Sequence, residues 1–208
     1  MASSSSGSER RGHVDVAEKT RRTRRRRRKI MTLQEYFSTP ETVLPQELIY
    51  GTMRVADSPT PVHQEAVGRL FLALHEHVSR RGLGTVWLAP LDVILDAERA
   101  LVVQPDLFAI LRGGAAIVAD KVRGAPDLVI EVLSPFPRIG EVTERVGWFR
   151  DYGVRECWLV DQIDRRIDVL QFEDGQVRSE QAFGPDDPIE SRVLPECRAI
   201  TRDLCHLP

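Results

Sequence analysis

Cysteine is scarce in this 208-residue sequence, and the few cysteines are not spaced as metal ligands. Cys157, Cys197 and Cys205 include no Cys-X-X-Cys pair, and an odd number cannot all be joined in disulfides. Both facts argue against a disulfide framework and against a zinc knuckle. Cys157 lies within an apolar run, so we expect it to be a small residue of the core.

Long apolar runs are also missing. The sequence has no stretch of 18 or more apolar residues, the length that a membrane-spanning helix needs, and its N-terminus lacks the apolar part of a secretory signal. We therefore expect a soluble, cytoplasmic protein without membrane contact. With 42% hydrophobic and 29% charged residues, the chain suffices for one sizeable core.

The charge is distributed unevenly. Residues 1–29 contain 11 Lys and Arg against three Asp and Glu, a net charge of +8, so the remainder carries −10. Because this segment has almost no apolar residues, we expect residues 1–30 to form a disordered basic arm before a single domain at 31–208. Such an arm could neutralise phosphates of nucleic acid. Two alternatives stay open: a merely solvated tail, or translated sequence upstream of a start at Met31.

Two short apolar runs, LVVQPDLFAI (101–110) and APDLVIEVLSP (125–135), contain acids among apolar residues. Side chains alternate along a strand, so Asp106, Phe108 and Ile110 share one face of the first run, and Asp127, Val129 and Glu131 share one face of the second. A buried acid is unfavourable unless it is paired. If the two runs pair, Asp106 and Glu131 converge at a strand end. Two such carboxylates suit a hard divalent cation, which predicts metal-dependent phosphodiester chemistry.

The motifs QPDL and GAPDLVIEVLSP, followed by a helix ending in YGV and the strand ECWLVD, resemble the Uma-type restriction endonucleases of the PD-(D/E)XK phosphodiesterase superfamily. The resemblance extends from about Met31 to Phe172. It implies an α/β fold with a restriction-endonuclease-like core, in which a central mixed β-sheet is flanked by helices. It also implies that Asp106 and Glu131 are the catalytic acids and hold Mg2+, with Mn2+ as a substitute.

One position departs from the superfamily pattern. The usual lysine follows the second acid by two residues, where this chain has Leu133. The Uma-type family has its lysine in the following helix, where this chain has Arg145. Arg145 can supply positive charge for catalysis, but with a pKa above about 12 it cannot act as a base. The alternative is an exposed ion pair with Glu141, worth only a few tenths of a kcal/mol.

Four further residues complete the predicted site. We expect the backbone carbonyl of Val132 to be a third metal ligand. The resemblance places Glu47 and His63 near the metal, Glu47 as a ligand and His63 as a substrate contact. Lys121 is the next cation that could contact substrate if Arg145 does not. The alternatives are a solvated acid for Glu47 and a surface residue for His63.

The remaining elements follow from periodicity and turn residues. We expect a short helix capped by Thr32, a strand with Gly51 near a bend, and an amphipathic helix from about His63 to Arg81. Strands follow at GTVWLAP and LDVILDAE, whose acids Asp92 and Asp96 should face solvent, and residues 112–124 should be a polar connector. A helix after Pro137, a hairpin of ECWLVD and RIDVLQF, and edge elements over residues 173–208 complete the predicted chain.

Three functional classes remain open. The favoured one is a metal-dependent endonuclease, a hydrolase acting on phosphodiester bonds of DNA. The second is a catalytically degenerate protein of the same fold that binds nucleic acid or a partner without cleavage, which the missing lysine suggests. The third is a small dimeric adaptor with structural acids. We expect DNA and a second copy of the chain, as a homodimer, to be the partners.

Overall fold

The computed structural model of the chain describes residues 30–40, 44–56, 58–134, 141–197, 199 and 201–204. The predicted basic arm at residues 1–29 lies outside the described residues, as does Cys205. Its disorder therefore stays a prediction. None of the described helices combines the length and the apolar composition that crossing a membrane requires.

The larger of two sheets contains six strands in the order β11-β10-β9-β8-β6-β3. These are β3 (Gly84–Leu88), β6 (Leu107–Leu111), β8 (Leu128–Val132), β9 (Glu156–Asp161), β10 (Arg166–Glu173) and β11 (Gln176–Phe183). Strands β8 and β9 are parallel, and the other neighbours are antiparallel. The predicted β9–β10 hairpin is confirmed, and the expected edge elements include strand β11.

The smaller sheet has five strands in the order β2-β1-β5-β4-β7. These are β1 (Gln46–Ile49), β2 (Thr52–Val55), β4 (Val93–Asp96), β5 (Leu101–Val103) and β7 (Val122–Arg123). Tyr50 and Gly51 have φ values of 48° and 77°, which suit the two-residue turn between β1 and β2. The predicted α/β class with a mixed sheet and flanking helices is confirmed, with the strands divided between two sheets.

The segment at residues 112–124 differs from its prediction. Instead of an irregular connector, it forms the 3-10 helix η2 (Arg112–Ile117) and strand β7, which pairs parallel with β4. Val122 is 1% exposed, so an apolar residue in a polar stretch drives this pairing. The segment does connect β6 to β8, as predicted, but its pairing with β4 was not predicted.

Four α-helices are described: α1 (Leu33–Phe37), α2 (Pro61–Leu74), α3 (Val142–Asp151) and α4 (Thr201–Leu204). The predicted helix from His63 to Arg81 corresponds to α2 and its continuation, the π-helix η1 (His75–Ser79). Thr32 caps α1 through a capping box with Glu35, as predicted.

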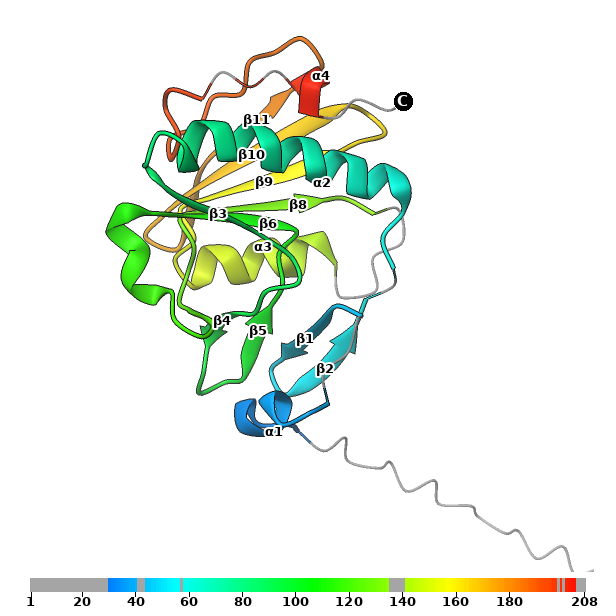
Figure 1. The fold of residues 1–208 in the computed structure, drawn as a ribbon, viewed down its shortest axis with the longest axis vertical. Coiled ribbons are helices and arrows are strands. Elements are labelled where there is room, and N and C mark those ends of the chain that lie inside the picture. The colour runs from blue at the N-terminus through cyan, green and yellow to red at the C-terminus, as the bar shows by residue number, and fades with distance from the viewer. Residues whose placement is uncertain are drawn as a thin grey trace, which may run out of the picture.

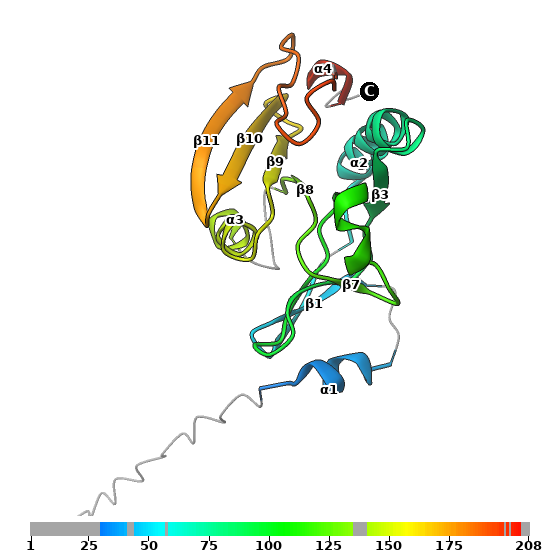
Figure 2. The same ribbon diagram turned by 90° about the vertical axis from the view of Figure 1, so that its left-hand side faces the viewer.

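Helices α2 and α3 lie on opposite faces of the larger sheet (Figure 1 and Figure 2). On the α2 side the core contains Leu107 and Ile130, and on the α3 side it contains Phe108 and Val129, in keeping with strand alternation. The smaller sheet contributes to the α3 side and buries its other face against α1. Residues from α3, from the ends of strands in the larger sheet and from the smaller sheet can therefore meet in one place.

Candidate functional site

The two strand acids meet at the end of a strand pair. Strands β6 and β8 are antiparallel, with Leu107 opposite Ile130, so the same register one step further pairs Asp106 with Glu131. The Asp106 carboxylate accepts a hydrogen bond from the backbone N–H of Val132 at 2.8 Å. This contact fixes Asp106 against the residue that follows Glu131. The expected pairing of the two runs is confirmed.

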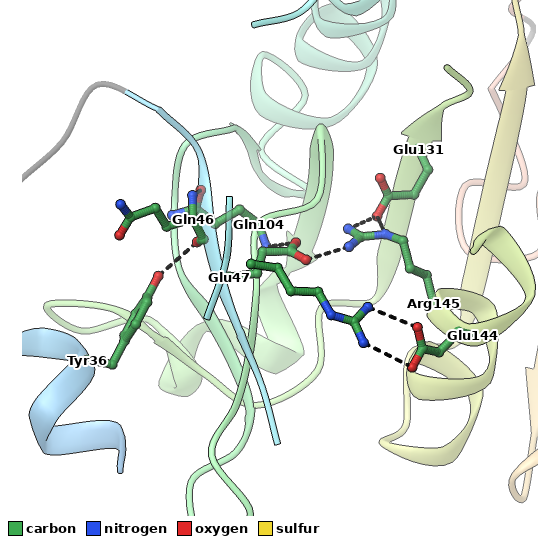
Figure 3. A network of polar contacts seen from close by, with 8 residues as sticks. Tyr36, Gln46, Glu47, Gln104, Glu131, Glu144 and Arg145 are labelled. Atoms are coloured by element: carbon green, nitrogen blue, oxygen red, sulfur yellow. Dashed lines mark hydrogen bonds and ion pairs between the residues drawn. The ribbon is translucent and has the colours of Figure 1, made fainter. Parts of the chain in front are cut away.

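Arg145 reaches this strand end from helix α3. Its Nε and Nη2 atoms donate to the same oxygen of Glu131, at 3.1 and 2.5 Å, and its Nη1 donates to Glu47 at 2.7 Å (Figure 3). With 9% exposure, the residue is buried. Towards Glu141 it makes only the helical backbone hydrogen bond. The alternative of an exposed Arg145–Glu141 pair is therefore wrong.

Glu47, on strand β1, is fully buried. One carboxylate oxygen accepts from Arg145 and the other from the backbone N–H of Gln104 at 2.7 Å. The reading of Glu47 as a solvated acid is wrong, because a guanidinium and an amide from two other elements surround it. A role as metal ligand stays a prediction.

His63 occupies the first turn of α2. Pro61 begins the helix, and the Thr60 hydroxyl accepts from the backbone N–H of His63 at 3.2 Å. Its Nε2 lies 3.3 Å from the Asp106 carboxylate, and its buried Nδ1 has no hydrogen-bond partner among the described residues. Burial lowers the pKa of His63, but Asp106, Glu131 and the Val132 carbonyl outweigh it and the pKa is raised. His63 therefore belongs to the same cluster.

The cluster contains more negative than positive charge. Carboxyl groups of Glu47, Asp106 and Glu131 gather here, and Arg145 contacts two of them, Glu47 and Glu131. Burial raises the pKa of Glu131 to about 8, and Asp106 adds to the increase while Arg145 opposes it. The excess of carboxylates makes this strand end attractive to a further cation.

Comparison with known proteins identifies the family of the chain. The family model described as "Putative restriction endonuclease" (Uma2) matches residues 33–203. The chain belongs to the Uma2 family. No curated protein matches the Uma2 chain.

A solved structure supports the fold independently. The chain resembles a protein from Anabaena variabilis described as "a putative nuclease belonging to DUF820", with 20% sequence identity and a TM-score of 0.69. The match covers 84% of this chain and 97% of that one. It shows a restriction-endonuclease-like fold. Membership of the Uma2 family supports a nuclease-like function, and so a hydrolase, at a coarse level.

Within the described part of the chain, Lys121 pairs with Asp92 and not with the acids Asp106 and Glu131. Its Nζ atom is 2.8 Å from Asp92 and 5.4 Å from the centre of the Phe37 ring. Asp92 is 6% exposed and also accepts from Tyr36 and Gln104, so the expectation that it faces solvent is wrong. The structure thus brings Glu47, Asp106, Glu131, Val132, Arg145 and His63 together and leaves Lys121 with Asp92.

Sequence reasoning missed Gln104 and Asp92. Gln104 donates to Glu47 through its backbone (Figure 3). Its side chain donates to Asp92, so Gln104 connects the site to the smaller sheet. The signal that could have found Asp92 was an acid at the start of an apolar strand. No comparable signal exists for Gln104, whose role depends on which strands pair.

Proposed function

We propose that this Uma2 chain is an endonuclease that hydrolyses phosphodiester bonds of DNA and depends on Mg2+, for which Mn2+ can substitute. The observation that carries the proposal is the placement of Asp106 and Glu131 across one strand pair, with a buried arginine against them. Acids on adjacent strands of a nuclease-like fold are suited to bind a hard cation.

The residues fit a magnesium ion in number and chemistry. Among the described residues, no three His, Cys, Asp or Glu side chains form a ready metal site. Asp106, Glu131 and the Val132 carbonyl would hold the ion, because Mg2+ uses one or two carboxylates and takes its remaining ligands from water and phosphate. When bound, the ion would activate water and neutralise charge on the reacting phosphate.

The protein's own groups divide the remaining work. The Val132 N–H holds the Asp106 carboxylate in place. Arg145 supplies a fixed positive charge beside Glu131, where it can stabilise negative charge on the phosphate but cannot accept a proton. His63 lies beside Asp106 in the first turn of α2, where its partly exposed imidazole ring can contact the substrate.

DNA is proposed as the substrate because of the basic N-terminal segment. Its net charge of +8 adjoins a domain sequence of net charge −10, so the segment supplies the attraction for phosphates that the domain lacks. Binding of this kind depends on salt and not on sequence. A homodimer stays part of the proposal.

A second candidate is a protein that binds DNA without cutting it. The specific observation in its favour is that Arg145 already contacts both Glu131 and Glu47. If no divalent ion can compete with that guanidinium, the acids serve only to hold Arg145.

Incubation of supercoiled plasmid with purified protein and Mg2+ or Mn2+ distinguishes the two candidates. We expect nicked and linear DNA that chelation prevents, and no products with Asp106→Asn. Salt-sensitive DNA binding without any metal-dependent product would contradict the endonuclease and support the second candidate.

A further inference from the structure

The two carboxylates that share the Arg145 guanidinium are held to different degrees. Both oxygens of Glu47 are occupied, one by Nη1 of Arg145 and the other by the backbone N–H of Gln104. Glu131 contacts Arg145 through one oxygen only, and its other oxygen has no hydrogen bond within the described residues. The Glu131 side chain is also 14% exposed, against 0% for Glu47. Glu131 is thus the partner that can be released.

Glu47 rests on a buried polar network. The Gln104 amide accepts from the backbone N–H of Gln46 at 3.2 Å and donates to Asp92 at 2.8 Å. Asp92 is held in turn by the Tyr36 hydroxyl at 3.1 Å and by Lys121. This network fixes Glu47 from the side of the smaller sheet, so its position does not depend on Glu131.

We propose that Arg145 is a built-in counter-ion that competes with the metal for Glu131, and that Glu47 is the anchor that keeps Arg145 paired when Glu131 is released. The inference rests on the proposed metal site of Asp106 and Glu131. It makes Glu47 a positioning residue for Arg145, without direct contact to the metal.

The physical reason is that a buried guanidinium needs a carboxylate in every state, because an unpaired buried charge is strongly unfavourable. Glu47 meets this need with Nη1, which leaves the Nε and Nη2 donors free to change partner. A phosphodiester anion presents two oxygens to such a fork and can take the place of Glu131. Substrate binding should therefore favour metal binding, and the reverse.

Calorimetric titration with Mn2+ under argon at pH 8.5 tests the inference without measuring cleavage. Arg145→Met removes the competitor, and we expect Mn2+ to bind at least tenfold more tightly than to the unmodified protein. Arg155→Met is the matched control, because Arg155 also pairs with a carboxylate, Asp127 at 2.9 Å, which precedes β8, whereas Glu131 lies near the end of that strand. Its Mn2+ affinity should be unchanged.

A second pair of variants guards against misfolding of Arg145→Met, in which Glu47 loses its partner. Glu47→Gln neutralises the carboxylate that would be left unpaired. The effect of Arg145→Met can therefore also be measured in the Glu47→Gln background, by comparing Glu47→Gln with Arg145→Met/Glu47→Gln. We expect the double variant to bind Mn2+ at least tenfold more tightly than Glu47→Gln. The Mn2+ affinity of the double variant should also match that of Arg145→Met within about threefold, because in this proposal Glu47 is not a metal ligand.

The possible outcomes separate this inference from the proposed function. Suppose that removal of Arg145 leaves Mn2+ binding equal or weaker, while the unmodified protein binds Mn2+ and Asp106→Asn does not. This result would overturn the inference and leave the metal site standing. A large loss of affinity from Glu47→Gln in the Arg145→Met background would make Glu47 a ligand and overturn its role as anchor. Absence of Mn2+ binding from every variant would overturn both the inference and the metal site.

Discussion

Glu131 is subject to opposing influences on its carboxyl group. Burial and Asp106 favour the protonated form, and Arg145 favours the ionised form, with a resulting pKa of about 8. Because this value lies above the ordinary 4.5, the stabilisation that Glu131 gives the fold is complete below about pH 4.5 and is lost as the pH rises to about 8.

Metal binding should show the opposite dependence on pH. A ligating carboxylate must be ionised, so the Mn2+ affinity should rise by up to about tenfold per pH unit between pH 6 and 8 and level off above. Calorimetry in two buffers of different ionisation enthalpy measures the proton released. A flat affinity over this range would show that Glu131 is already ionised or is not a ligand.

Replacement of Arg145 by lysine should increase cleavage. Lysine keeps the positive charge but cannot hold Glu131 and Glu47 together as the forked guanidinium does. We expect the cleavage rate to rise by about tenfold, which corresponds to about 1.4 kcal/mol of barrier. Cleavage of labelled DNA by Arg145→Lys and by the control Arg155→Lys, at an arginine that pairs with Asp127, checks this. An equal change in both variants would show that the effect is not specific to Arg145.

Individual residues show where sequence reasoning succeeded. Asp106 and Glu131 could be paired because strand alternation and the spacing of two apolar runs are local properties. The burial of Glu47 was not predictable, because it requires the smaller sheet to lie beside α3. Glu156 was also missed: it is fully buried and accepts from Trp158, Ser191 and the backbone of Arg192. An acid at the start of the apolar run ECWLVD was the available signal.

At the scale of elements, strand β3 depends on a close backbone contact. A Cβ atom at Gly84 would lie 2.3 Å from the carbonyl oxygen of Ile110, on the paired strand β6. We expect Gly84→Ala to lower the free energy of unfolding by about 1–3 kcal/mol, because backbone cannot move aside as a side chain can.

Gly147 provides the matched substitution. It lies in α3, and a Cβ atom there would meet nothing within 4 Å. Alanine should therefore raise the free energy of unfolding by about 0.5–1 kcal/mol through helix propensity. Urea denaturation of both variants measures the difference. A similar effect of the two substitutions would contradict the described pairing of β3 with β6.

The elements also mark the limit of prediction from sequence. Helix α2 was recognisable because its apolar residues recur at helical spacing over many turns. Strand β7 has only two residues and is defined by its partner β4, so no periodicity could reveal it. The division of the strands between two sheets depends on long-range pairing in the same way.

On the scale of the whole molecule, we expect the basic N-terminal segment to be separable from the folded domain. In the full chain the backbone N–H of Met31 donates to the Gly51 carbonyl at 2.8 Å, so contacts with the folded domain include Met31. A chain beginning at Met31 therefore retains this residue. We expect its melting temperature to stay within about 2 °C of the full chain, because the removed residues are almost devoid of apolar side chains.

The same truncation should weaken DNA binding. Loss of a net charge of +8 removes phosphate contacts, so the affinity should fall and its dependence on salt should become shallower. Fluorescence anisotropy with labelled DNA at several salt concentrations measures both. An unchanged salt slope would show that the segment makes no phosphate contacts, and a large drop in melting temperature would show that it belongs to the fold.

The most direct test of the account is a calorimetric Mn2+ titration of the unmodified protein, Asp106→Asn and Glu131→Gln. The account predicts saturable binding to the unmodified protein and its loss in both variants. Their melting temperatures should be unchanged or higher, since each substitution removes a repulsion between like charges. Undiminished Mn2+ binding by both variants would contradict the account and return Asp106 and Glu131 to a purely structural role.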